Sequence, residues 1–147
     1  MAAYIDKPGM QERFSDAELI AITDRSGAGS IDDAVLNLAI DGAESEADSY
    51  LMSRYPVPVS PVPVVLTDKC ADITRHRLHL TYNASVPENV ESAYKAALAW
   101  LADVRDGKQH LDGVNEREDG SGNGPVGTRR TMTMSDDCLA KMPGAAC

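Results

Sequence analysis

The chain has 147 residues, with 23 acidic and 14 basic side chains and a formal net charge of −9 at pH 7. That length is close to one average domain, and an acidic chain lacks the basic surface that binding of DNA or RNA phosphates demands. No run of about 18 apolar residues occurs and the first residues form no apolar signal-peptide core, so we expect neither a membrane span nor secretion.

The cysteines are odd in number and far apart, at Cys70, Cys138 and Cys147. They form no C-x-x-C pair, so neither a zinc knuckle nor a disulfide framework is predicted, and we expect reduced thiols in a cytosolic setting. The chain has one Trp, five Tyr and one Phe. We therefore expect a core of Leu, Ile, Val and Ala.

The first predicted helix begins at Ser15. Ser15 and Glu18 have the spacing of a capping box, in which each side chain satisfies a backbone N–H of the other residue. Phe14 before the cap and Leu19 after it form a hydrophobic staple. Residues 24–29 read as a loop, so this helix is short.

A second helix is predicted from a cap at Ser30 to about Arg54. Its apolar residues step by four and three, as one face of a helix requires; they are Leu36, Ile40, Ala43, Ala47 and Leu51. Its opposite side carries the carboxylates Asp41, Glu44, Glu46 and Asp48. This acidic face is predicted to be solvated, with a docking surface for a basic partner as the alternative.

Prolines between residues 55 and 63 predict an extended connector, because proline lacks a backbone N–H and disfavours helix in the residue before it. A third helix is then expected from about Pro63 to Tyr82. The buried seam expected on it is Leu66, Cys70, Ile73, Arg77 and Leu80. Cys70 is interpreted as a small core residue rather than a nucleophile.

A fourth helix is predicted from a capping box at Ser85 and Glu88 to a glycine stop at Gly107. Its seam shows the clearest helical spacing in the chain: Val90, Tyr94, Ala97, Leu101 and Val104. No run of alternating β-branched residues occurs. We therefore predict an all-α fold for residues 1–111, a small antiparallel bundle of about four helices.

The composition changes after Leu111. Residues 112–127 are rich in glycine and carry few apolar side chains, which predicts a flexible linker. Residues 128–147 are expected to form an extended arm that orders on a neighbouring molecule. The residues expected to dock are Arg129, Arg130, Met132, Met134, Leu139 and Met142.

Few residues are spaced for catalysis or metal binding. Asp72, His76 and His79 share one side of the third helix, and a metal-dependent enzyme built on them is a rival hypothesis. Asp119 opens half of a calcium loop, but the twelfth position, which needs Glu, is Arg130. No nucleophile elbow or phosphate loop is present. We expect no cofactor, no metal and no enzymatic activity.

Three segments in this order resemble one family. They are Asp48-Ser49-Tyr50-Leu51-x-x-Arg54-Tyr55 followed by prolines, then Cys70-Ala71-Asp72-Ile73, then Tyr94-Lys95-Ala96-Ala97-Leu98-x-Trp100-Leu101-x-x-Val104-x-x-Gly107-Lys108-x-x-Leu111. With the short capped helix before them, they resemble the small head–tail joining proteins of Mu-type phages and prophages, over about residues 4–111.

The resemblance implies a connector subunit in the virion neck, made in the cytoplasm of the bacterial host. It implies a ring beneath the portal, with twelvefold symmetry expected, and contacts with the portal, neighbouring copies and the next neck or tail-terminator protein. Genomic DNA would pass through the centre, where the acidic face of residues 41–48 would line the channel or contact a neighbour. A small acidic regulatory module that binds a basic protein is the alternative function.

Arg54 and Tyr55 are interpreted as a structural clamp rather than a portal contact. Arg54 ends the long second helix, where a cation complements the negative end of the helix dipole. Tyr55 is expected to pack beneath the proline connector.

Overall fold

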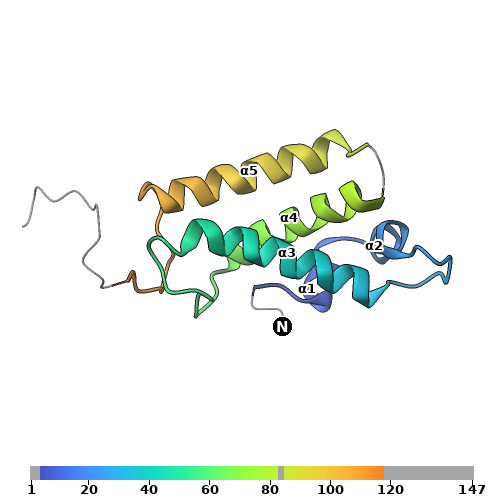
Figure 1. The fold of residues 1–147 in the computed structure, drawn as a ribbon, viewed down its shortest axis with the longest axis horizontal. Helices are drawn as coiled ribbons and strands as arrows, with labels where there is room; N and C mark the ends of the chain where they lie inside the picture. Colours follow the sequence, from blue (N-terminus) through green and yellow to red (C-terminus); the bar gives the residue numbers. More distant parts are fainter. Residues whose placement is uncertain (1–3, 83–84, 118–147) are drawn as a thin grey trace, which may run out of the picture. The chain divides into compact units, whose positions relative to one another are not determined.

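The computed structural model describes residues 4–82 and 85–117. Those ranges contain helices and no strand, which confirms the predicted all-α fold. The described residues form five helices, one more than expected (Figure 1). They are α1 (Lys7–Arg13), α2 (Asp16–Thr23), α3 (Asp33–Leu51), α4 (Val64–Tyr82) and α5 (Glu88–Arg105).

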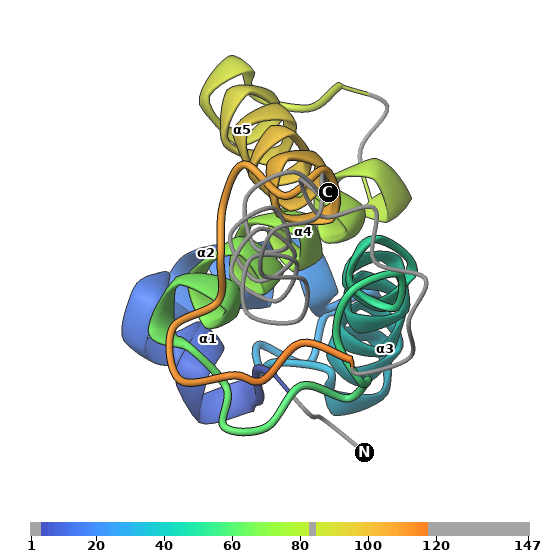
Figure 2. The same cartoon turned by 90° about the vertical axis from the view of Figure 1, so that its left-hand side faces the viewer.

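Helix α4 lies at the centre of the fold and contacts each of the other four helices. Helices α3, α4 and α5 pack together with alternating direction, and α1 and α2 pack against α3 and α4 (Figures 1 and 2). The core side chains are mostly aliphatic, as the composition predicts. Cys70 is fully buried among them, as predicted, and burial raises the pKa of its thiol.

The first two helices are short and begin at side-chain caps. Helix α1 was not expected; the Asp6 carboxylate accepts a hydrogen bond from Gly9 N–H at 2.9 Å and caps it. The predicted cap of α2 is confirmed, because Ser15 Oγ accepts from Glu18 N–H at 3.2 Å. The Glu18 side chain binds Arg75 of α4.

Helix α3 is shorter at both ends than predicted. Its N-cap is Asp32, not Ser30, since the Asp32 carboxylate accepts hydrogen bonds from Ala34 N–H and Val35 N–H. It ends at Leu51 instead of Arg54. At the N-cap, the charge of the Asp32 carboxylate also complements the positive end of the helix dipole, which a neutral serine cannot do.

The boundaries of α4 and α5 agree with the predicted helices, but two details were wrong. Leu80, placed in the seam of α4, is 57% exposed, and Leu78 is buried instead. The N-cap of α5 is Pro87, with no side-chain capping bond, so the predicted capping box at Ser85 is absent. Gly107 does end the helix as predicted, with φ +83°, a conformation that favours glycine.

The folded unit extends beyond the expected boundary at Leu111. Val114 packs against the core, and Arg117 N–H donates to the carbonyl of Arg54 at 2.8 Å. Residues 112–117 therefore belong to the helical unit rather than to a linker. The rest of the predicted linker, the docking arm, Cys138 and Cys147 lie outside the described residues. No helix within the described ranges has the length and apolarity needed to cross a bilayer.

Candidate functional site

The acidic side chains of α3 do not form one solvated face. Glu44 is 7% exposed, and its Oε1 accepts hydrogen bonds from Tyr4 N–H at 2.7 Å and Ile5 N–H at 3.2 Å. Asp48 accepts a hydrogen bond from the Tyr4 hydroxyl, and Val59 N–H donates to that hydroxyl at 3.0 Å. These two carboxylates hold the N-terminal segment and the proline-rich segment of residues 55–63 against α3.

Burial raises the pKa of Asp48, and the neighbouring charge of Glu44 acts in the same direction, while the hydrogen bond from Tyr4 opposes both. Burial also raises the pKa of the Tyr4 hydroxyl. The hydroxyl therefore stays protonated and keeps its hydrogen for Asp48. This pair joins groups 44 residues apart in sequence.

Glu46 lies in a polar layer between α3, α4 and α5. It accepts hydrogen bonds from the Tyr94 hydroxyl at 2.9 Å and from Arg77 Nη2 at 2.7 Å. The Tyr94 ring stacks on His76 with 3.8 Å between ring centroids. Of the predicted acidic face only Asp41 is exposed. The expectation of a solvated stripe is therefore wrong, because Glu44, Glu46 and Asp48 bind groups of their own chain.

The two histidines of the rival metal hypothesis contact different neighbours. His76 stacks on Tyr94 of α5, whereas His79 Nε2 lies 3.4 Å from Glu18 Oε1 of α2. No group of three potential ligands that could hold a metal occurs in the described ranges. We therefore do not carry the metal hypothesis forward.

Glu18 joins α2 to α4 in a half-buried ionic cluster. Arg75 Nε donates to Glu18 Oε1 at 2.6 Å, and the Arg75 guanidinium also lies 4.8 Å from the centre of the Phe14 ring. Burial alone would raise the pKa of Glu18, but the hydrogen bond and charge of Arg75, with those of His79, lower it overall.

The lowered pKa of Glu18 predicts an acid-dependent loss of stability. A group whose pKa is lower in the folded state stabilises the fold above its unfolded pKa, here the ordinary 4.5, and this contribution is lost as pH falls through the folded pKa. We expect Glu18→Gln to destabilise the protein at neutral pH and to differ less from the parent near about pH 3. Urea unfolding of both proteins between neutral pH and about pH 3 measures the difference in their free energies of unfolding. A difference that does not change with pH would contradict a lowered pKa of Glu18 in the folded state.

Arg54 connects the end of α3 with the segment that follows α5. Its Nη1 donates to the carbonyl of Val104 at 2.8 Å, and its Nη2 forms an ion pair with Glu116. Its own carbonyl accepts from Arg117 N–H. Both the side chain and the backbone of Arg54 thus bind residues 104–117.

Tyr55 is the apolar half of the same junction. Its side chain is 1% exposed within the core, and its hydroxyl accepts a hydrogen bond from Leu111 N–H at 3.1 Å. Arg54 and Tyr55 together position the chain from Val104 to Arg117, the last described residue. These two residues together form the clamp.

A known protein family matches the same part of the chain. The family model described as bacteriophage Mu Gp36 matches residues 4–128, which include all five helices and the clamp. The chain belongs to the Mu Gp36 family. It is 32% identical over 126 residues to gene product J of Escherichia phage Mu, with 84% of each chain covered.

A second Gp36 relative comes from a prophage. The Mu-like prophage FluMu protein gp36 of Haemophilus influenzae is 33% identical over 78 residues, which are 53% of this chain and 55% of that protein. The match to the Gp36 family model ends at residue 128. The predicted docking residues from Arg129 to Met142 therefore lie outside both the family match and the described residues.

Proposed function

We propose that this member of the Mu Gp36 family is a non-catalytic connector subunit of the virion neck. The observation that carries the proposal is the family match across the whole helical unit. The clamp supports it, since it holds the segment from Val104 to Arg117 against the end of α3. A connector needs such a fixed attachment point, because the terminal segment that follows it has to reach a partner.

The partners that this role requires are the portal protein, neighbouring copies in a ring of twelvefold symmetry, and the next neck or tail-terminator protein. Genomic DNA passes through the ring, and the net charge of −9 favours passage over adhesion because it repels phosphates. The residues proposed to dock on the portal or a neighbour are those of the C-terminal arm, Arg129, Arg130, Met132, Met134, Leu139 and Met142.

The regulatory-module alternative loses its basis in the structure. It requires exposed carboxylates on residues 41–48 to bind a basic protein. Glu44, Glu46 and Asp48 instead bind groups of their own chain. We therefore propose the connector role alone.

Co-sedimentation with DNA-filled, tailless heads tests the proposal. We expect saturable binding of the full chain and weaker binding of a 1–117 truncation. The truncation keeps Glu116 and Arg117, which contact Arg54, so it retains the clamp. Circular dichroism checks that it is helical.

The two parts of the proposal fail separately in this experiment. If the full chain does not bind intact portal-bearing heads at micromolar concentration, the connector role is wrong. If the truncation binds as tightly as the full chain, the connector role stands and the proposal that the C-terminal arm docks on the head is wrong. Arg129→Ala with Arg130→Ala in the full chain then identifies whether the basic pair contributes.

A further inference from the structure

The exposed large apolar side chains of the described residues gather at two places. Leu38, Leu80 and Tyr82 lie on the first half of α3 and the last turn of α4, whereas Met52, Val64 and Val65 lie where α3 ends and α4 begins. Helices α3 and α4 are antiparallel neighbours, so the two groups occupy opposite ends of this helical hairpin (Figure 1). Helix α4 has 19 residues, which separates the ends by about 28 Å.

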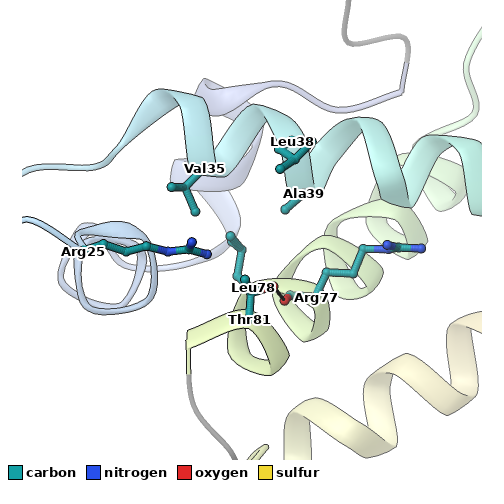
Figure 3. A pocket seen from close by; sticks show the side chains of 7 residues that line it. All are labelled: Arg25, Val35, Leu38, Ala39, Arg77, Leu78 and Thr81. Atoms are coloured by element: carbon teal, nitrogen blue, oxygen red, sulfur yellow. Dashed lines mark hydrogen bonds between the residues drawn. The ribbon is translucent and has the colours of Figure 1, made fainter.

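The end that contains Leu38 has a surface pocket of about 220 Å³. Its apolar lining comes from both helices, and Arg25 reaches across it from the loop after α2 (Figure 3). The lining residues are Arg25, Val35, Leu38, Ala39, Arg77, Leu78 and Thr81. The pocket is thus suited to an aliphatic side chain beside a negative charge.

Arg25 differs from every other arginine in the described part of the chain. Arg13, Arg54, Arg75, Arg77 and Arg105 each form an ion pair, and Arg117 donates to a carbonyl. Arg25 forms no hydrogen bond or ion pair within that part. A guanidinium carries five donors that pair best with a carboxylate, so Arg25 lacks an acidic partner.

The opposite end of the hairpin offers the complementary chemistry. Val64 is 72% exposed, and Asp68 lies four residues later, on the same face of α4. Both contacts of Arg13 with Asp68 use Oδ1, at 2.8 Å and 2.7 Å. Oδ2 of Asp68 can therefore accept a second guanidinium.

We propose that the N-terminal end of α4 in one copy, with Val64 and Asp68, docks into the Arg25 pocket of a second copy. Val64 fills the apolar pocket, and Asp68 pairs with Arg25. The two surfaces differ and lie at opposite ends of one molecule, so the contact is head-to-tail and continues from copy to copy. This inference rests on the proposed connector role and assigns the subunit contact within it.

Cross-linking of single-cysteine variants tests the contact. In a Cys138→Ser, Cys147→Ser background that keeps buried Cys70, Leu38→Cys and Val64→Cys are made separately. Each variant is treated with a short bis-maleimide alone and in an equimolar mixture, both on tailless heads and in concentrated solution. We expect covalent dimers in the mixture only. A chain with both cysteines should give a ladder beyond the dimer, because each copy has both ends.

Charge reversal in the pocket provides the matched control. Arg25→Glu in the Leu38→Cys chain should lower the dimer yield about tenfold, equivalent to about 1.4 kcal/mol. Arg105→Glu, which reverses the charge of an exposed arginine on α5, should leave the yield unchanged. Equal losses from both reversals would overturn the role of Arg25.

The remaining outcomes separate this contact from the connector role. Head binding without cross-links in the mixture overturns the contact and leaves the connector role standing. Cross-links in solution without head binding support the contact and contradict the connector role. Dimers of Leu38→Cys alone or of Val64→Cys alone would show a symmetric contact, which overturns the head-to-tail arrangement.

Discussion

Replacing Tyr55 with alanine is expected to lower the free energy of unfolding by about 3–5 kcal/mol, the cost of removing a buried aromatic ring. Tyr55 is among the largest fully buried side chains, and it fills the junction between the end of α3 and the segment after α5. Tyr82→Ala is the control, because Tyr82 is 46% exposed, and it should cost less than about 1 kcal/mol. Urea unfolding followed by circular dichroism measures both.

Tyr55→Phe separates the ring from the hydroxyl. It retains the packing but leaves the buried N–H of Leu111 without its acceptor, so we expect a loss of about 1–3 kcal/mol. If Tyr55→Ala and Tyr82→Ala cost the same, Tyr55 does not anchor the segment from Val104 to Arg117. If Tyr55→Phe costs nothing, the ring alone holds the junction.

The contacts of the clamp are expected to affect head binding as well as the stability of the fold. A chain that has lost the Tyr55 contact loses the fixed position of residues 111–117, which precede the proposed C-terminal arm in the sequence. We infer that head binding weakens with the clamp even where the bundle remains helical.

Helices that depend on local signals could be predicted from the sequence. The cap of α2 at Ser15 and the stop of α5 at Gly107 each involve residues a few positions apart. The four-three spacing of α5 places Val90, Ala97 and Leu101 in the core. Helix α1 also has a local start signal, Asp6 as N-cap and Pro8 in the first turn, but its seven residues are too few to show a period and only Met10 is buried.

The partners of the acidic residues could not be predicted, because they come from distant parts of the chain. Glu44 binds the backbone 39 and 40 residues before it, and Tyr94 reaches Glu46 from 48 residues away. One local signal was present. Glu44 lies four residues after Ile40 and seven before Leu51, so helical spacing places it beside the buried seam.

The positions of Arg54 and Tyr55 in the sequence predicted a structural clamp, but they did not show which distant residues the clamp contacts. The glycine-rich composition after Leu111 favoured a linker beginning there. Composition cannot show that Glu116 and Arg117 meet Arg54, since that contact joins residues 62 and 63 positions apart. The pocket at Arg25 was missed for the same reason, because it forms only when the end of α4 meets the start of α3.

Leu66 and Leu80 of α4 are expected to differ sharply in their contribution to stability. Periodicity placed Leu66 and Leu80 in one seam, which would make their truncation equally costly. The structure separates them, because Leu66 is fully buried whereas Leu80 is exposed. We expect Leu66→Ala to cost about 2–5 kcal/mol and Leu80→Ala to stay within about 0.5 kcal/mol of the parent.

The comparison of Leu66→Ala with Leu80→Ala also tests how α4 ends. A helix that contacts four others is buried on several sides. Leu78 can therefore be buried although Leu80, two residues later, is exposed. A seam defined by period alone assumes one buried face, and that assumption fails for a central helix. Equal losses in urea unfolding of the monomer would mean that Leu80 packs inside the bundle. A loss at Leu66 alone places Leu80 on the surface, at the end of the hairpin that carries Leu38 and Tyr82.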